Sequence, residues 1–361
     1  MDAPCYLRVV SLEFEKWEGT GNDFVLVDRR QDGRLPDRWS DQEVVRLCDR
    51  KLGVGADGVL IVGLGDQNKL EVDFRNPDGS RSFCGNGTRS ALAWAFEKGL
   101  VGPEVDISAV DGMHHGRILD DEMPGITMNV LNAPEECSSL IPSAVHASFI
   151  HSGSPHHVEW LQYRHELERL DLNKVAQPIR RHECYAPEGC NVNVVVSHEG
   201  SLWIRTFERG VENETLSCGT GVVAAALGEF NRQNVHAGTH DMDVHARGGT
   251  LKVRADIGPH GECSNVWLMG KARKVFAGKF WMALMALMWC CVPAFGSAFE
   301  LGPLSNSARI SVLTASPGSD LYAAFGHSAI RLTDPESDLD VVFNYGTFTV
   351  NEDFYIDFVR G

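Results

Sequence analysis

An alternation of apolar and polar positions near residue 70 predicts the first strand–turn–helix unit of the chain. Within residues 70–74 every second side chain is apolar, as on a half-buried strand, and the sequence Asn76-Pro77-Asp78-Gly79 is typical of a turn. Residues 90–98 then consist of helix-forming types, and Gly99 ends the stretch. We expect a strand, a turn and a helix in this order.

The same order of patterns recurs in the third quarter of the chain. Leu202, Ile204 and Thr206 share one face of a predicted strand, the segment 208–210 turns the chain, and an Ala-rich stretch at residues 222–230 favours a helix. Both units carry the sequence Cys-Gly-x-Gly directly before the helix, beginning at Cys84 and at Cys218. The repetition predicts an internal duplication whose halves face each other.

Cys84 and Cys218 each precede a predicted helix N-terminus, and this position suits chemistry on an anion. The free N–H groups and positive dipole end of a helix bind a carboxylate, and glycine neighbours let a ligand approach the backbone. Two cysteines on opposite faces of one carbon could invert it, one removing a proton and the other returning one. We expect one of them to be ionised and the other protonated. The pattern alone does not distinguish this pair from a redox pair that closes a disulfide.

Composition and charge narrow the class of protein. The chain has 361 residues, 43% hydrophobic and 23% charged, enough for a large core and two or three structural units. Its 33 Lys and Arg against 49 Asp and Glu give a net charge of -16, the wrong sign for a nucleic-acid-binding surface. The ten cysteines lack zinc-ligand spacing, and residues 1–15 lack the apolar run of a secretory signal. We expect no metal, no nucleic-acid partner and a cytoplasmic N-terminal part.

A different kind of boundary is predicted near residue 280. Basic residues lie within 271–279, residues 280–294 are almost wholly apolar, and small residues follow at 296–298. This order is typical of a secretory signal peptide in mid-chain, so that residues 280–298 could associate with a membrane; a buried core helix is the alternative. Residues 299–361 predict a partial strand-rich segment with a marginal core, including strands at 308–313 and 340–343.

Six motifs, in order and with family-like spacing, resemble diaminopimelate epimerase over about residues 7–280. They are Gly19-Thr20-Gly21-Asn22-Asp23-Phe24, Gly53-Val54-Gly55-Ala56-Asp57-Gly58, Asn76-Pro77-Asp78-Gly79-Ser80 through Cys84-Gly85-Asn86-Gly87, Gly153-Ser154-Pro155-His156, Asn191-Val192-Asn193, and Glu208-Arg209-Gly210 through Cys218-Gly219-Thr220-Gly221.

The resemblance implies an α/β fold of two pseudo-symmetric lobes, each a curved mixed sheet around a central helix. The first lobe would span residues 7–131, with 265–280 returning to it, and the second lobe 132–264. It implies an isomerase that converts LL-diaminopimelate to meso-diaminopimelate for lysine and peptidoglycan precursor synthesis, without pyridoxal phosphate or any other cofactor, as a homodimer. A proline or hydroxyproline epimerase of the same fold and a cysteine-based redox or binding protein are the alternatives.

Matching positions carry the family's site onto this sequence. Cys84 and Cys218 match the two catalytic cysteines, and His156 matches a histidine that orders the site. Three asparagines match side chains that bind the substrate: Asn22, Asn76 and Asn191. The residues that match the cradle of the reacting carboxylate are Gly85, Asn86, Gly219 and Thr220. Glu208 matches the acid and Arg209 the cation at the substrate's charged groups, and Glu208 is also a catalytic candidate.

These positions also admit structural interpretations. The asparagines could satisfy turns, and Glu208-Arg209 could be a solvated pair. One of the adjacent His156 and His157 is expected to be an exposed loop residue. Ser154 stands where many family members have Asn, and Gly58 where some have Gln, so we assign substrate contacts to neither.

The C-terminal segment is similar to the opening of a bacterial periplasmic domain of unknown function, the Lnb-type amino-terminal domain. The similarity rests on motifs such as Phe325-Gly326-His327-Ser328-Ala329 and Asn344-Tyr345-Gly346. We expect His327 to be structural rather than catalytic. Either a lost stop codon has joined two reading frames, or a real fusion directs the tail across the inner membrane; the truncation favours the first.

Overall fold

The computed structural model describes residues 8–30, 39–119 and 123–284, and in the C-terminal part residues 305, 307–314, 328–335 and 339–344. The chain divides into two compact units, residues 1–286 and 287–361. Each unit is described by itself.

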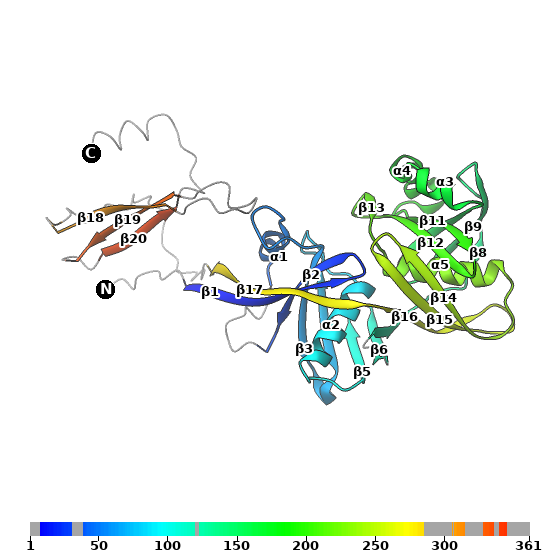
Figure 1. The fold of residues 1–361 in the computed structure, drawn as a ribbon, viewed down its shortest axis with the longest axis horizontal. Helices are drawn as coiled ribbons and strands as arrows, with labels where there is room; N and C mark the ends of the chain where they lie inside the picture. Colours follow the sequence, from blue (N-terminus) through cyan, green and yellow to red (C-terminus); the bar gives the residue numbers. More distant parts are fainter. Residues whose placement is uncertain are drawn as a thin grey trace. The chain divides into compact units, whose positions relative to one another are not determined.

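In the first lobe, strands curve around the central helix α2 (Gly85–Glu97), as Figure 1 shows. The sheet is mixed, because β2 pairs parallel with β3 and β4 parallel with β5, whereas β1, β6 and β7 make antiparallel pairs. The short helix α1 (Asp41–Cys48) packs on β3. The strands are β1 (Arg8–Gly19), β2 (Asn22–Asp28), β3 (Gly58–Leu64), β4 (Leu70–Arg75), β5 (Glu104–Ala109), β6 (Gly112–Ile118) and β7 (Pro124–Thr127).

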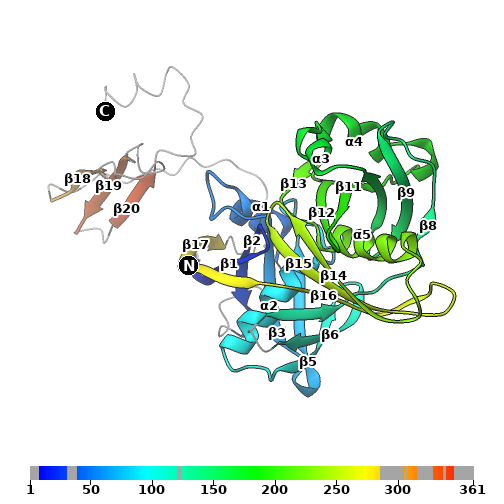
Figure 2. The ribbon, with the colours of Figure 1, turned by 45° about the vertical axis from the view of Figure 1, so that its right-hand side comes forward.

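The second lobe repeats this arrangement around the helix α5 (Gly219–Arg232), which Figure 2 shows among its strands. Two further helices, α3 (Arg164–Arg169) and α4 (Leu172–Arg180), pack on β11. The strands are β8 (Glu135–Glu136), β9 (Ala144–His151), β10 (Pro155–Leu161), β11 (Asn191–His198), β12 (Ser201–Glu208), β13 (Asn213–Thr215), β14 (Gly238–Ala246) and β15 (Gly249–Ile257). The expected two-lobed α/β fold is confirmed.

Strand β16 (Cys263–Gly270) links the lobes, and β17 (Ala272–Leu284) leads the chain back into the first lobe. β16 pairs with β15 of the second lobe on one side and with β7 of the first lobe on the other. β17 then returns along the whole of β1, from Gly19↔Ala272 to Arg8↔Leu284. Both pairings of β16 are ladders of backbone hydrogen bonds, so the two lobes share one continuous sheet.

The two central helices are buried because strands surround them. In α5, residues 222–227 are all 0% exposed, and they are only Val, Ala and Leu. A helix that is apolar on every side has no solvent face, and its alanines let the surrounding sheet approach closely. The same holds for Ala91, Leu92 and Ala95 of α2. The core therefore fixes both helices, and with them the positions of their N-termini.

The structure extends the first unit past the boundary expected at residue 280. β17 continues to Leu284, and Phe280 packs against the cluster that includes Val44 and Leu47 of α1, so the start of the segment 280–298 belongs to a strand of this unit. Residues 285–298 lie outside the described residues. Among the residues that the structure describes, no helix is long and apolar enough to cross a membrane.

The described part of the second unit is a three-stranded antiparallel sheet, β18 (Arg309–Thr314), β19 (Ser328–Asp334) and β20 (Leu339–Asn344). Strands were expected at 308–313 and 340–343, and both are present; β19 was not expected. His327 lies outside the described residues.

Candidate active site

Cys84 and Cys218 occupy equivalent positions, as the N-cap residues of α2 and α5. Both have extended backbone geometry, with φ/ψ of −132°/106° and −125°/112°. The backbone N–H of Gly87 donates to Sγ of Cys84 over 3.4 Å. Sγ of Cys218 lies 3.4 Å from Oγ1 of Thr220. Each sulfur therefore lies at the positive end of a helix.

The two helix N-termini meet at the centre of the first unit. A Cβ atom added to Gly219 would lie 3.3 Å from Oδ1 of Asn86 and 2.9 Å from Cδ2 of Leu268 on β16. A Cβ atom on Gly85 would lie 3.0 Å from the same leucine atom. Glycine at both positions thus lets the two helix ends lie close to Leu268, and Gly219 lie close to Asn86.

A cleft of about 960 Å³ opens over this junction. All the expected site residues except His156 line it. They are Asn22, Asn76, Cys84, Gly85 and Asn86 from the first lobe and Asn191, Glu208, Arg209, Cys218, Gly219 and Thr220 from the second.

Asn22 and Asn86 form a polar bridge across the floor of the cleft. Nδ2 of Asn86 donates to Oδ1 of Asn22 over 2.7 Å, and Nδ2 of Asn22 donates to Oδ2 of Asp57 over 3.1 Å. Nδ2 of Asn86 also lies 3.5 Å from Oγ of Ser217, beside Cys218. Asn22 is therefore part of a network between the lobes and not a turn residue that satisfies its own backbone.

Asn76 and Asn191 hold loops at the cleft. Asn76 caps its own turn, because its Nδ2 donates to Oγ of Ser80 over 3.0 Å, which agrees with the structural interpretation. Asn191 instead joins two loops: its Oδ1 accepts from the backbone N–H of Arg209 (2.8 Å), and its Nδ2 donates to Oγ of Ser154 (3.0 Å).

His156 lies behind the cleft and contacts Cys218 through Thr220. It is 0% exposed, and burial lowers its pKa to about 3, so the ring is neutral at pH 7. Nδ2 of Asn193 donates to Nδ1 of His156 over 2.9 Å, which leaves the proton of the ring on Nε2. Nε2 lies 2.9 Å from Oγ1 of Thr220 and 2.9 Å from Oγ of Ser154. A neutral hydrogen-bond chain therefore runs from Asn193 to the sulfur of Cys218.

Glu208 and Arg209 do not form a solvent-exposed ion pair, which was the structural alternative for these two residues. Glu208 is partly buried at the end of β12, where its Oε1 accepts from Oγ1 of Thr215 over 2.5 Å, and burial raises its pKa. No described carboxylate pairs with the guanidinium of Arg209, which lines the cleft. The cleft thus places the acid Glu208 next to a cation that has no carboxylate partner among the described residues.

The charge state of the cysteines differs from the expectation that one of them is ionised. Burial raises the pKa of Cys84 to about 12 and that of Cys218 well above its usual value, and the carboxylate of Glu208 raises both pKa values further. The backbone N–H groups of Gly87 and Asn86 act in the opposite direction on Cys84 but are outweighed. Both thiols are therefore neutral at pH 7 in the empty cleft.

Comparisons with known proteins point to one family. The family model for diaminopimelate epimerase matches residues 14–129 and 148–275. Diaminopimelate epimerase from Flavobacterium psychrophilum is 32% identical over 274 residues, which cover 73% of this chain and 98% of that protein. The enzyme of the same name from Aquifex aeolicus is 33% identical over 282 residues, covering 74% and 97%.

The chain belongs to the diaminopimelate epimerase family. Solved structures of other proteins share the fold of this family member at low identity. A phenazine biosynthesis protein of the PhzF family from Bacillus anthracis has a TM-score of 0.59 at 14% identity, covering 76% of this chain and 99% of that one. A hydroxyproline epimerase from Agrobacterium vitis has a TM-score of 0.52 at 14% identity, covering 76% and 93%. These likenesses show the fold alone.

The two positions of this epimerase family member to which no substrate contact was assigned, Ser154 and Gly58, have clear surroundings in the structure. Ser154 is a junction, because its Oγ contacts His156, Thr220 and Asn191, so a short hydroxyl side chain completes the network behind Cys218. At Gly58, a side chain would collide with the ring of Phe74, which lines the cleft.

The expectation that one of the two adjacent histidines is exposed was wrong, since both are 0% exposed. Successive residues of a strand point to opposite faces, and both faces of β10 are covered. His157 faces away from Thr220: its Nε2 lies 2.8 Å from Oε1 of Glu159, and its Nδ1 lies 2.6 Å from the hydroxyl of Tyr185.

Asn193 was not expected as a site residue. It is 0% exposed and links Thr206 to His156, because its Oδ1 accepts from Oγ1 of Thr206 over 2.9 Å. The signal in the sequence was a polar side chain between Val192 and Val194, since a buried amide needs specific partners.

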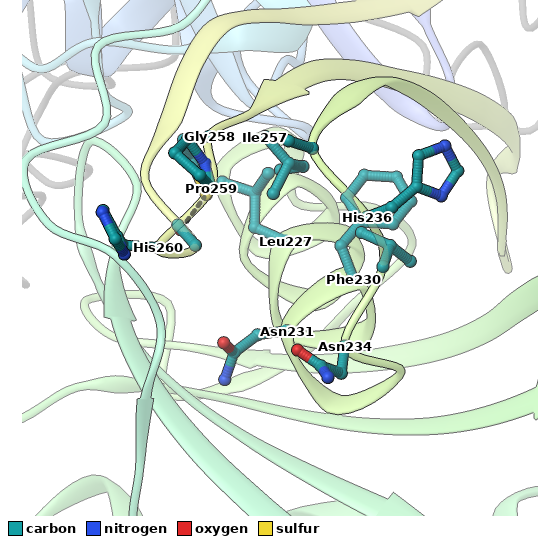
Figure 3. Close-up of a pocket in the computed structure, with 13 residues that line it drawn as sticks. Leu227, Phe230, Asn231, Asn234, His236, Ile257, Gly258, Pro259 and His260 are labelled. Atoms are coloured by element: carbon teal, nitrogen blue, oxygen red, sulfur yellow. Dashed lines mark hydrogen bonds between the residues drawn. The ribbon is translucent and has the colours of Figure 1, made fainter.

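A second cavity, of about 440 Å³, lies at the C-terminal end of α5. Figure 3 shows its lining, with Leu227 and Phe230 from the helix, Ile257 from the end of β15 and Pro259 from the turn that follows. The carbonyl end of a helix disfavours a carboxylate, so this cavity does not suit the anion chemistry of the cleft. Within the described ranges, no group of three or more His, Cys, Asp or Glu side chains could hold a metal ion.

Proposed function

We propose that this chain interconverts LL- and meso-diaminopimelate by a two-base mechanism in the cleft. One cysteine removes the α-proton of the substrate, and the other delivers a proton to the opposite face. The observation that carries the proposal is the pairing of Cys84 and Cys218 at two helix N-termini that meet beneath one cleft. The family and the relatives at 32–33% identity supply the substrate.

The helix N-termini stabilise the charge that develops when the α-proton leaves. The carbanion delocalises onto the α-carboxylate, so this carboxylate needs donors that are already in place. The N–H groups of Gly85, Asn86, Gly219 and Thr220 lie in the first turns of α2 and α5 and have no acceptor four residues earlier within their helices. We assign the reacting carboxylate to these donors.

Substrate binding would produce the thiolate that the empty cleft lacks. The α-ammonium group pairs with Glu208, whose carboxylate otherwise raises the pKa of both cysteines. Neutralising this carboxylate lowers the pKa of both thiols, and the ammonium group attracts the thiolate directly. The base therefore forms when the substrate is present: one thiol gives its proton to solvent water at the open cleft, and the other thiol stays protonated.

The rest of the cleft suits a long substrate with a second amino acid group. Arg209, with which no described carboxylate pairs, offers its guanidinium to the distal carboxylate, and Asn76 and Asn191 line the same cleft. His156 takes no proton in this scheme, because a buried ring with a pKa near 3 is a poor base at pH 7. It orients the hydroxyl of Thr220 toward Cys218.

The decisive assay follows diaminopimelate in deuterium oxide, with incorporation of deuterium at Cα measured by NMR. The wild-type protein should incorporate deuterium and equilibrate the isomers, and Cys84→Ala and Cys218→Ala should each abolish turnover. Cys→Ser variants should retain weak activity, because a hydroxyl forms far less of the anionic base at neutral pH than a thiol does. Full turnover by Cys84→Ala would refute the two-base assignment.

The two alternatives predict different results. A proline or hydroxyproline epimerase of this fold would turn over its cyclic substrate in the same assay, and diaminopimelate would not compete. A redox protein would lose its function on reduction, whereas an epimerase with two close thiols should be inactivated reversibly by oxidation. Mass spectra of oxidised and reduced protein would show whether Cys84 and Cys218 form a bridge.

We further propose that the epimerase part acts as a cytoplasmic homodimer and that the residues after Leu284 come from a read-through of two reading frames. The support is the family resemblance and the signal-like order of residues 280–298. A native protein of full mass that sediments with membranes would instead support a genuine fusion with membrane association through 280–298. A species ending shortly after Leu284 would support two separate products.

A further inference from the structure

Arg89, in the second turn of α2, is buried without a carboxylate partner. The side chain is 0% exposed. Nη1 donates to the carbonyl oxygen of Gly270 (2.5 Å), and Nη2 donates to Oδ1 of Asn86 (2.7 Å) and to Oγ1 of Thr20 (3.1 Å). Nε has no partner among the described residues. Every acceptor is uncharged, and no described Asp or Glu forms an ion pair with this guanidinium.

The guanidinium keeps its charge in this position. Burial lowers the pKa of Arg89 to about 10, which still leaves it protonated at pH 7. A buried charge without a partner is unfavourable for folding, and an apolar side chain of similar volume would avoid this penalty. Packing alone therefore does not explain an arginine here.

The position of Arg89 connects it with the reacting centre. Its hydrogen bond fixes Oδ1 of Asn86, so that Nδ2 of Asn86 points toward Asn22 and Ser217 on the floor of the cleft. Asn86 is the second residue after Cys84 and one of the carboxylate donors proposed above. Arg89 thus places a positive charge beneath the helix end that receives the anion.

We propose that Arg89 is a positioning residue that supplies the countercharge for the anions formed in the cleft, the reacting carboxylate and the thiolate of Cys84. The carboxylate part rests on the proposed function. The thiolate part concerns the protein alone and is tested without any substrate.

The other charged groups around the two residues do not replace this role. Glu208 on β12 and Cys218 on α5 face Cys84, and Glu208 disfavours its thiolate. Glu18 on β1 acts on Arg89 from a distance, but its carboxylate already accepts from the backbone N–H of Gly21 (2.6 Å) and pairs with Arg273 (3.0 Å). Arg89 opposes Glu208 and favours the thiolate of Cys84.

The test compares Arg89→Met with Asn86→Ala, using alkylation by the neutral reagent iodoacetamide. The rate at Cys84 is read by peptide mass spectrometry from pH 6 to pH 9. Arg89→Met removes the charge, whereas Asn86→Ala removes the side chain that Arg89 orients and keeps the charge. Arg89→Gln, neutral but able to donate hydrogen bonds, serves if the methionine variant does not fold.

Loss of the charge should raise the pKa of Cys84 by about one unit, the low end for a nearby opposite charge. The thiolate fraction then falls about tenfold. The remaining thiolate is more basic and therefore about threefold more nucleophilic, so the alkylation rate falls by less than the thiolate fraction. Alkylation of Cys84 should therefore slow about threefold at every pH in Arg89→Met and Arg89→Gln. It should stay within about twofold of wild type in Asn86→Ala.

Three outcomes separate the possibilities. Slower alkylation in the neutral Arg89 variants, with no loss of thermal stability, supports the proposal. Unchanged alkylation in these variants, or equal slowing in Asn86→Ala, overturns it and leaves Arg89 a purely structural residue. Because alkylation needs no substrate, a wild-type protein that fails to epimerise diaminopimelate refutes the proposed function and leaves this result unaffected.

Discussion

Replacing Thr220 by Val tests the hydrogen-bond chain behind Cys218. The substitution preserves shape and removes only the hydroxyl, whose oxygen lies 3.4 Å from Sγ of Cys218. The fold should be retained, because Nε2 of His156 keeps a partner in Oγ of Ser154 at 2.9 Å. The valine variant loses the hydroxyl that can donate a hydrogen bond to the thiolate of Cys218 during the reaction.

The size of the effect follows from the chemistry of that hydrogen bond. A hydrogen bond to a charged group contributes about 1.5–3 kcal/mol, and the long contact to sulfur favours the lower value. About 1.4 kcal/mol corresponds to one pKa unit, so the pKa of Cys218 should rise by about one unit and the rate should fall about tenfold. The enzyme cannot alter the equilibrium between the isomers, so kcat/KM should fall by the same factor in both directions.

The assay is deuterium incorporation and isomer interconversion, measured for wild type, Thr220→Val and Thr220→Ser. The serine variant keeps the hydroxyl and is the matched control, with activity expected within about threefold of wild type. Equal losses in the serine and valine variants would show that the methyl group or the helix end matters and not the hydroxyl. A valine variant with full activity would refute the hydrogen-bond chain altogether.

Three further predictions concern packing and charge. Gly221→Ala would place its Cβ 2.5 Å from Oδ1 of Asn193, so overpacking of about 1–3 kcal/mol should exceed the helix preference for Ala, and melting and turnover should both fall. Because the pKa of Glu208 is raised, the folded state holds this proton more tightly than the unfolded state does, and the free energy of unfolding declines as pH rises above about 4.5. The melting temperature of Glu208→Gln should therefore lie above that of wild type at pH 7 but not at pH 4. The pKa of Asp23 is lowered to about 2 by Arg50 and by buried Lys16, so about 2 kcal/mol of stability is present above pH 4 and is lost as pH falls toward 2. The denaturation midpoint of Asp23→Asn should accordingly fall below that of wild type at pH 7 and converge with it near pH 2.

The sequence allowed the framework of the site to be predicted because its signals are local. The turn at residues 76–79 and the helices after Cys84 and Cys218 depend on neighbours in the chain, and the structure contains each of them. The cysteines could be paired in advance because the same short pattern occurs twice. The start of each helix is earlier than the apolar stretch indicated, since the glycines of the motif already lie in the first turn.

The supporting residues could not be found in this way because their roles depend on distant segments. Arg89 resembles a surface residue of a helix, and only its approach to Gly270 and Thr20 reveals burial. His157 is buried because Tyr185 and Glu159 cover the outer face of its strand. The neutral state of the thiols likewise reflects desolvation by the assembled lobes, and local sequence contains no measure of it.

Leu268 has a consequence for how a substrate can enter. On β16 it pairs with Ile126 of one half and with Val253 of the other, and its side chain would contact a Cβ on either Gly85 or Gly219. Complete separation of the halves would break these ladders, so any wider opening of the cleft has to bend or twist this strand. In such a motion the two helix ends next to Leu268 would move less than the outer rim of the cleft. A molecule built this way can admit and release its ligand without losing the alignment on which inversion of the carbon depends.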